Sequence, residues 1–298
     1  MGLHYQMVKK RGKCMLLRSL LLVIVCSFVQ FASAAQVVTS GSGLAATTTA
    51  RNAFRTILGG GTVAGANGSF GGVRREINWD GVPDAFSAPN NLPANFFNAN
   101  SPRGAVFSTP GNGFQVSATA ASGTPVRFGN INPTYPGTFT AFSPERLFTP
   151  LSSNVMSVSF FVPGTSLPAT VSGFGAIFTD VDTLNGASLQ FFDAANKPIG
   201  SAIAPTSAGD VSFVGVSFDA GERIRTVLIT AGNSALGPNN APPGIDVVAM
   251  DDFIYAEPQL VGVAPLPIPA LHPLGVLLLS LLVAMGGRRL VRSRRQLF

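Results

Sequence analysis

Aspartate and asparagine side chains gather in one short run of this 298-residue chain, DVDTLNG at residues 180–186. Asp180, Asp182 and Asn185 would place oxygen atoms close together in a loop, as Ca²⁺ sites require. The run differs from an EF-hand loop, because Leu184 stands where that loop has a polar ligand and no glutamate follows at the twelfth position. The pattern therefore leaves two interpretations, a structural calcium site or an Asx-rich β-turn, and it favours the turn.

A second pair of carboxylates, Asp251 and Asp252, lies inside an apolar run that predicts a β-strand over residues 245–255. Side chains alternate along a strand, which places Asp251 on the face of Phe253 and Asp252 on the face of Met250. One of the two carboxylates must then point toward the core or its rim, where it needs a partner. The expected partners are a calcium ion, a backbone donor, or one of Arg127, Arg223 and Arg225, with solvent at the rim of the sheet as the remaining alternative.

The central part of the chain lacks the side chains of most other catalytic or metal sites. Cys14, Cys26 and His4 lie near the N-terminus and His272 near the C-terminus. Disulfides, thiolate nucleophiles, Ser-His-Asp catalysis and zinc sites are thereby excluded between them. A glycosidase would need two facing carboxylates, and no spacing in the sequence indicates such a pair, so we expect no enzyme. The carboxylates considered for that role are Glu76, Asp80, Asp84, Glu145 and Glu222.

Trp79 is the only tryptophan, and an exposed tryptophan beside polar groups can stack on a sugar ring. A single tryptophan in a strand is more often part of the core. Only Tyr135 and Tyr255 could add further polar aromatic side chains to this part of the chain. The sequence therefore favours a core position for Trp79 and keeps carbohydrate binding as an alternative.

These residues belong to a central region, residues 36–258, that is long enough for one sizeable core. Residues 45–58 have helical periodicity, with an apolar side formed by Ala50, Phe54, Ile57 and Leu58. Runs bounded by turn residues predict strands at residues 74–79, 104–108, 113–118, 155–162, 171–179, 188–193, 199–204, 211–218, 224–230 and 245–255. The prediction is all-β: a single antiparallel two-sheet β-sandwich of jelly-roll type with one short N-terminal helix.

The N-terminus has the three parts of a Sec-type signal peptide. Basic residues come first, an apolar segment follows at residues 20–28, and Ala32, Ala34 and Ala35 supply small side chains for signal peptidase. We expect cleavage after Ala34 or Ala35, so that the mature chain begins near Gln36.

The C-terminus combines a short proline-containing motif, an apolar segment at residues 274–287 and a basic tail. The motif residues are Ile268, Pro269, Leu271 and Gly275, and the tail residues are Arg288, Arg289, Arg292, Arg294 and Arg295. This arrangement resembles the C-terminal sorting domains of exported Gram-negative bacterial proteins, the PEP-CTERM group and especially its IPTL-CTERM relative. Ala270 and His272 depart from the pattern of that relative. The resemblance implies recognition by an exosortase-like or related sorting protease.

The order of motifs in the central region is similar to that of β-sandwich ectodomains that carry such sorting signals. The motifs lie at residues 174–182, 189–193, 213–218, 224–229 and 250–255. The resemblance implies no biochemical activity. It implies a division into a signal peptide (residues 1–35), a β-sandwich ectodomain (36–258), a proline-rich linker with the sorting motif (259–273), a transmembrane segment (274–287) and a cytoplasmic tail (288–298).

The charge distribution agrees with export and excludes nucleic-acid binding. The formal net charge of +6 comes from the two basic ends, which leave ten basic residues between them against all fourteen acidic ones. The central region therefore has no excess of positive charge to bind phosphates. Both basic ends are expected to stay cytoplasmic under the positive-inside rule.

The sequence as a whole predicts a non-enzymatic surface or matrix protein. It would be exported by the Sec machinery, held in the inner membrane with a periplasmic domain, and delivered to the cell surface or outside. The alternatives are a carbohydrate- or exopolysaccharide-binding module, a glycosidase, and a permanently anchored inner-membrane protein. Structural calcium is the only cofactor that the sequence suggests.

Overall fold

A computed structural model describes residues 36–65, 72–219, 221, 223–239 and 244–261. The predicted signal peptide, sorting motif, apolar segment and basic tail lie outside these residues. The described chain is a sandwich of two antiparallel sheets, as predicted from the sequence, with one helix on the outer face of the larger sheet.

The larger sheet has the order β1-β11-β8-β13-β5-β4, and β2 also pairs with β13. Its strands are β1 (Gln36–Ser42), β2 (Arg74–Ile77), β4 (Gly113–Val116), β5 (Phe148–Leu151), β8 (Gly173–Val181), β11 (Ser207–Phe218) and β13 (Ala249–Ala256). The smaller sheet has the order β10-β9-β12-β6-β3. Its strands are β3 (Ala105–Ser108), β6 (Val155–Phe160), β9 (Ala187–Phe192), β10 (Pro198–Ile203) and β12 (Thr226–Ala231). A separate pair consists of β7 (Ala169–Thr170) and β14 (Gln259–Leu260).

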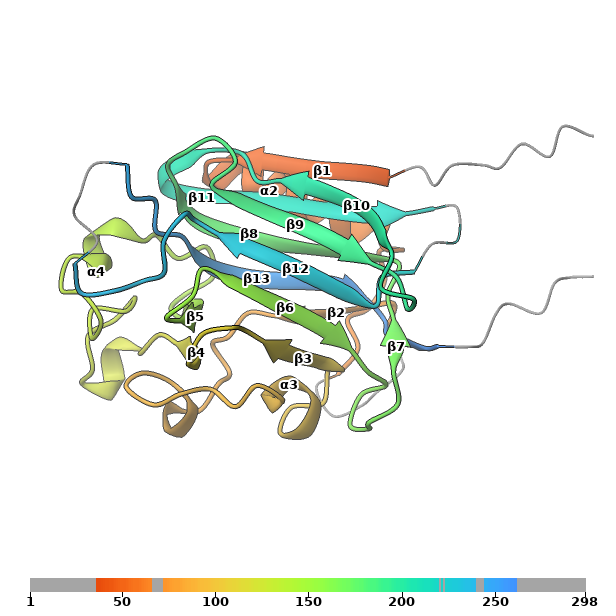
Figure 1. Cartoon of the computed structure of the whole chain (residues 1–298), viewed down its shortest axis with the longest axis horizontal. Coiled ribbons are helices and arrows are strands. Elements are labelled where there is room, and N and C mark those ends of the chain that lie inside the picture. The colour runs from red at the N-terminus through yellow and green to blue at the C-terminus, as the bar shows by residue number, and fades with distance from the viewer. Residues whose placement is uncertain (1–35, 66–71, 220, 222, 240–243, 262–298) are drawn as a thin grey trace, which may run out of the picture.

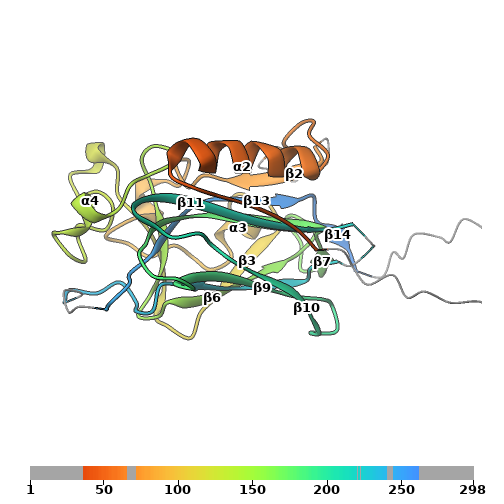
Figure 2. The same cartoon turned by 90° about the horizontal axis from the view of Figure 1, so that it is seen from above.

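The helices are α2 (Leu44–Ile57), α3 (Phe96–Ala99) and α4 (Tyr135–Thr138), with two 3₁₀ turns, η1 (Asp84–Phe86) and η2 (Ala120–Ser122). Figure 1 shows both sheets from the side of the smaller one, and Figure 2 shows α2 lying on the opposite face of the larger sheet. The chain enters α2 from β1 at Gly43, whose φ of 79° suits glycine.

The predicted helix is confirmed, and each predicted strand overlaps an observed one. Ala50, Phe54 and Leu58 of the predicted apolar side are buried, whereas Ile57 is exposed. Four strands were not predicted: β1, β5, β7 and β14. Because β14 pairs with β7, the folded domain continues to Val261, beyond the predicted boundary at residue 258.

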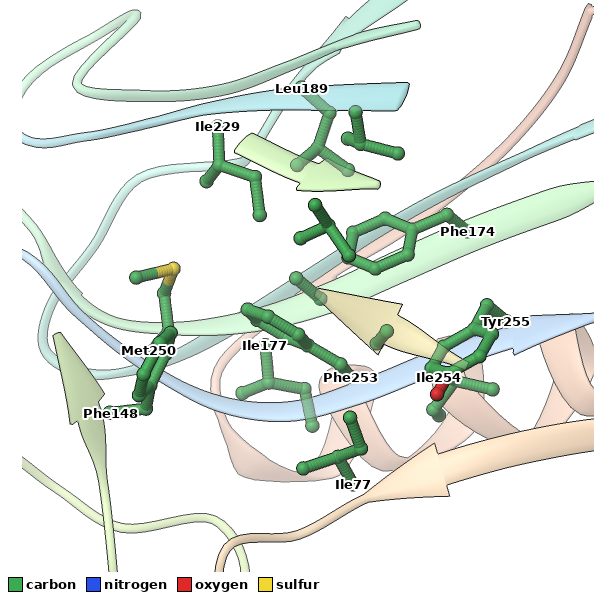
Figure 3. Close-up of a cluster of buried hydrophobic side chains, with 14 of the residues drawn as sticks. Ile77, Phe148, Phe174, Ile177, Leu189, Ile229, Met250, Phe253, Ile254 and Tyr255 are labelled. Atoms are coloured by element: carbon green, nitrogen blue, oxygen red, sulfur yellow. The ribbon is translucent and has the colours of Figure 1, made fainter. Parts of the chain in front are cut away.

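The core lies between the two sheets and contains many phenylalanine side chains. Figure 3 shows Phe174, Leu189 and Ile229 converging there from both sheets, whereas Ile177 and Ile254 project to the opposite face of the larger sheet. That second face is covered by α2, whose Phe54 ring lies 5.6 Å from the ring of Phe213. The larger sheet is therefore covered on both faces, which explains why β8 and β13 are buried along their whole length and mostly apolar.

A β-bulge in β13 alters the predicted alternation. Met250 pairs with Phe178 and Phe253 with Ala176, so β13 has one more residue than β8 between these two pairs, at Asp251 and Asp252. Met250 and Phe253 consequently point into the same core, as Figure 3 shows. The prediction that they lie on opposite faces was wrong, because a bulge shifts every residue beyond it by one position.

Candidate functional site

The β13 bulge places two adjacent carboxylates beneath the loop that precedes β5. The Oδ2 atom of Asp251 accepts hydrogen bonds from the backbone N–H groups of Phe142 at 2.7 Å and Ser143 at 3.2 Å. Asp251 is 0% and Asp252 5% exposed, so water reaches neither carboxylate freely. The bulge also frees the carbonyl oxygen of Asp251, which accepts a hydrogen bond from Nε1 of Trp79 at 2.8 Å.

The two carboxylates share the hydroxyl of Ser143, which lies 2.9 Å from Oδ1 of Asp251 and 2.9 Å from Oδ1 of Asp252. A hydroxyl has one hydrogen and can donate to only one of them. Burial, followed by the charge of Asp252, raises the pKa of Asp251 well above its ordinary value. Burial also raises the pKa of Asp252. Burial thus favours the neutral form of each carboxyl group over its charged form.

The charged neighbour of this pair is Arg51 on α2, whose Nη1 lies 3.9 Å from Oδ2 of Asp252. Its guanidinium also stacks over the ring of Phe142, 4.8 Å from the ring centre. The sequence thus predicted correctly that backbone donors or an arginine satisfy these carboxylates, but it proposed the wrong arginines. Those three arginines bind backbone carbonyl oxygens instead: Arg127 those of Pro136 and Phe139, Arg223 that of Thr170, and Arg225 that of Phe160.

A second group of carboxylates forms around Asp246, which precedes β13 and is fully buried. Oδ2 of Asp246 accepts hydrogen bonds from the backbone N–H of Thr183 at 2.9 Å and from its hydroxyl at 2.5 Å. Asn185 has a φ of 67°, and the N–H of Gly186 donates to the carbonyl oxygen of Thr183, which closes a β-turn. The favoured interpretation of residues 180–186, an Asx-rich β-turn, agrees with this geometry.

The structure separates the aspartates that the sequence offered for calcium into two groups. Asp180 and Asp182 lie near Asp246, and Asp251 lies next to Asp252. Within the described part of the chain, no three or more Asp, Glu, His or Cys side chains are arranged to hold a metal ion. In both groups backbone N–H donors, which repel a cation, point at a carboxylate.

Asp180 lies at the end of β8 with a φ of 66° and accepts a hydrogen bond from the N–H of Gly209 at 2.7 Å. Burial raises its pKa from 3.8 to about 6, and the charges of Asp182 and Asp246 add to the rise, against the effect of the Gly209 hydrogen bond. This side chain is one source of a pH-dependent stability in the domain, beside Asp251 and Asp252, whose pKa values are also raised.

We predict that the free energy of unfolding falls as the pH rises between about 4 and about 6. In this range the folded domain keeps the Asp180 proton while the unfolded chain releases it. Asp180→Asn should flatten the fall and raise stability at neutral pH, because asparagine still accepts the Gly209 bond and tolerates a positive φ. Urea unfolding of residues 36–261 at a series of pH values measures the slope.

An equal slope in Asp180→Asn and the unsubstituted domain would contradict this assignment. Urea unfolding at neutral pH, once with calcium and once with a chelator, separates the effect of proton release on stability from that of cation binding. Calcium bound only by the folded domain would raise its stability, and Asp180→Asn would then lose that gain instead of being more stable.

Trp79 does not offer a surface for a sugar. Its side chain is 1% exposed and stacks on Phe148 with ring centres 4.0 Å apart, and the rings of Phe97 and Phe253 lie nearly perpendicular to it. Tyr135 and Tyr255 are also buried. The core position favoured from the sequence is the observed one, and the carbohydrate role of Trp79 is corrected: both faces of the ring are covered by protein.

The carboxylates considered for glycosidase chemistry are held by their own partners. Glu76 binds Arg55 and Arg74, and Asp84 binds Arg146. Asp80 accepts the N–H of Arg146 and Glu145 that of Ala120, while Glu222 lies outside the described residues. Each of these described carboxylates thus connects a strand or loop to another part of the domain.

Sequence reasoning missed Arg51, Ser143 and Asp246. Ser143 lies 108 positions from Asp251 along the chain, and Asp246 lies 63 positions from Thr183. Arg51 belongs to the polar side of a helix that sequence periodicity assigned to solvent. Only the pairing of β8 with β13 and the packing of α2 bring these residues to their partners, so no local pattern could have identified them.

A comparison with models of known protein families finds no family that matches the chain, and no curated protein sequence matches it. Within the residues that the structure describes, none of the helices has the length and apolar character needed to cross a membrane.

Proposed function

We propose that this chain is an exported, non-enzymatic envelope protein of a Gram-negative bacterium. Its β-sandwich is displayed on the far side of the inner membrane, and the C-terminal apolar segment at residues 274–287 holds it there until a sorting protease, of the exosortase type or a related one, releases it. The Sec machinery and signal peptidase act at the N-terminus, and delivery ends at the cell surface or outside the cell.

One structural observation carries this proposal: both described ends of the domain lie at the same end of the sandwich (Figures 1 and 2). We call it the exit end; it comprises Gln36, loop 161–168, turn 193–197 and residues 257–261. Gln36 bonds through its side chain to Ser201 of β10, and Val261 bonds to Pro168 beside β7. Both ends of such a domain can be attached to one membrane, because neither segment has to run along the sandwich to reach the membrane.

The described start of the fold adds support. Gln36, where the mature chain is expected to begin, is already paired with Phe218 at the edge of the larger sheet. Signal peptidase would therefore cut directly before the first strand. The central region also has no cysteine, so the domain needs no disulfide-forming step after export.

A non-enzymatic role is supported by the burial and pairing of the acidic side chains. Burial raises the pKa of Asp180, Asp251 and Asp252, which are buried, and of the half-buried Asp80, whose carboxylate accepts the backbone N–H of Arg146. A carboxyl group that donates or accepts a proton in catalysis must reach the substrate. These groups instead bind turns and helices of their own domain.

We also infer that the sandwich is a jelly roll. Its support is the nested pairing of the strands from β5 to β13, leaving out the short β7. The first strand of this series pairs with the last, β5 with β13; the second with the seventh, β6 with β12; the third with the sixth, β8 with β11; and the middle two with each other, β9 with β10. Two sheets that exchange strands in this nested way are the pattern of the jelly-roll fold.

Reporter fusions test the proposed topology. A reporter that is active only in the periplasm, inserted at the exposed Asn239, should be active, and the same reporter fused after Phe298 should be silent. Both basic ends are retained in the cytoplasm under the positive-inside rule while the domain crosses. Activity of the fusion after Phe298 would refute the C-terminal sorting signal.

A charge variant supplies the control. Replacing the five arginines of the tail by serine removes the positive charge that retains the tail in the cytoplasm. The substitutions leave the sequence of the folded domain unchanged. The fusion after Phe298 should then become active, while the reporter at Asn239 stays active. The tail arginines are Arg288, Arg289, Arg292, Arg294 and Arg295.

A further inference from the structure

We propose that the exit end of the sandwich is a surface that rests on an anionic phospholipid bilayer, with the opposite end facing away. This orientation rests on the proposed anchoring of residues 274–287. The argument uses the length of chain outside the structure, one exposed apolar patch and the separation of charge between the two ends.

The chain between the domain and the anchoring segment is short. Only residues 262–273 separate Val261 from Leu274, and twelve residues span at most about 40 Å when fully extended. A tether of this length keeps the domain at the bilayer surface. It does not by itself decide which side of the domain faces the lipids, so the surface chemistry must do so.

An apolar patch lies where the chain leaves the domain. Leu167, Leu260 and Val261 are 52%, 42% and 37% exposed. They are neighbours, because Leu260 pairs with Ala169 and the N–H of Val261 donates to the carbonyl oxygen of Pro168. Exposed aliphatic side chains beside a membrane tether can enter the boundary between headgroups and acyl chains, which removes their apolar surface from water.

Basic side chains lie at the same end of the sandwich as this patch. Arg223 binds Thr170 of β7, Arg225 stacks on Phe161, and Arg103 stacks on Phe97. Lys197 is exposed in the β9–β10 turn, and the three arginines are half-buried. Among the described residues, none of these four cations forms an ion pair, so no carboxylate cancels the positive charge that they present toward lipid phosphates.

The acidic side chains at the exit end are fewer or already engaged. Glu257 is paired with Arg75. Asp193 accepts the N–H groups of Ala195 and Lys197 but keeps its charge, so two unpaired carboxylates, those of Asp193 and Asp219, face the four unpaired cations. Asp219 is exposed. The local balance of described, unpaired side chains therefore favours positive charge, although the central region as a whole is acidic.

The opposite end carries the acidic excess. Asp180, Asp182, Asp210 and Asp246 gather there around the β8–β9 loop and the β10–β11 connection, and within the described residues none of them has an ion-pair partner. Leu184 is 80% exposed at this end, but it lies among these carboxylates. An anionic bilayer repels this end and attracts the exit end, which orients the tethered domain.

Depth-dependent quenching in bilayers tests the orientation. The mature chain, residues 36–298, which contains no cysteine, is reconstituted into phosphatidylcholine vesicles that contain phosphatidylglycerol and a lipid with a nitroxide headgroup. A fluorophore is attached through Ser166→Cys at the exit end or through Leu184→Cys at the opposite end. Both positions are exposed. Flotation in a density gradient first establishes whether the chain is held by the vesicles.

We expect the chain to float and the fluorophore at position 166 to be quenched several times more strongly than that at position 184. Flotation with equal quenching, or with stronger quenching at position 184, would overturn the orientation and leave the anchoring intact. Failure to float would overturn the anchoring, and the orientation with it. Replacing phosphatidylglycerol by phosphatidylcholine should reduce quenching at position 166, and no change would overturn the role of the basic residues.

A matched pair of variants tests the apolar patch. Leu260→Ser combined with Val261→Ser should bring quenching at position 166 close to the level at position 184. Leu184→Ser removes an exposed leucine from the other end and should leave quenching at position 166 unchanged. A circular dichroism spectrum equal to that of the parent chain verifies the fold of each variant. Unaltered quenching in the double variant would overturn the insertion of the patch.

Discussion

Replacing Trp79 by alanine should lower the free energy of unfolding by about 3–5 kcal/mol, the usual cost of removing a large buried aromatic side chain. The ring lies between Phe148 and Phe253, and its Nε1 satisfies the carbonyl oxygen of Asp251 at the β13 bulge. The substitution would therefore open a cavity and leave a buried acceptor without its donor. Denaturant unfolding of residues 36–261, followed by circular dichroism, measures the loss.

Two further variants separate the contributions of packing and hydrogen bonding. Trp79→Phe keeps an aromatic ring but removes the Nε1 donor, so it should cost less than Trp79→Ala. Leu184→Ala changes an exposed side chain and should alter the free energy of unfolding by less than about 0.5 kcal/mol. A cost for Trp79→Ala as small as that of Leu184→Ala would show that Trp79 is not part of the core.

Replacing Arg75 by methionine should cost about 3–5 kcal/mol, because it breaks a buried ion pair and leaves one charge alone. The Arg75 side chain is fully buried in β2 and binds both carboxylate oxygens of Glu257 at 2.7 Å. Its Nη1 also donates to the carbonyl oxygens of Gly65 and Pro102. One side chain thus connects β2 to the end of β13 and to two loops.

Arg55 provides a matched control with similar geometry and more exposure. It binds both oxygens of Glu76, at 2.8 and 2.6 Å, but its side chain is 27% exposed. Arg55→Met should cost less than about 1 kcal/mol, because Glu76 remains paired with Arg74. Equal costs for the two substitutions, both measured by urea unfolding, would contradict the role assigned to burial.

Local patterns in the sequence were sufficient for most of the fold. Alternation and turn residues located β6, β9 and β12, and the spacing of Ala50 and Phe54 located α2. They failed for β1, which is rich in serine and glycine and forms a strand because β11 offers an edge to pair with. They also failed for β5, which contains Pro150, a residue that cannot donate a hydrogen bond to a neighbouring strand.

The candidate site was harder to predict, because its partners are distant in the chain. The need for a partner at Asp251 followed from the apolar run around it, but Phe142 and Ser143 meet it only through the fold. The bulge itself has no signal in the sequence of β13, since it is defined by pairing with β8. Burial of Trp79 was the favoured interpretation, whereas its stacking on Phe148 required the structure.

The central claim, an exported sandwich attached to the membrane through a C-terminal segment that is later removed, is tested most directly by intact-mass measurement of the native protein from the cell envelope and from the medium. The account predicts an envelope form that lacks residues 1–34 or 1–35 and retains the C-terminal segment, together with a released form that also lacks the apolar segment and the basic tail. A single species with the mass of the whole 30.8 kDa chain, recovered from the cytoplasm, would contradict it.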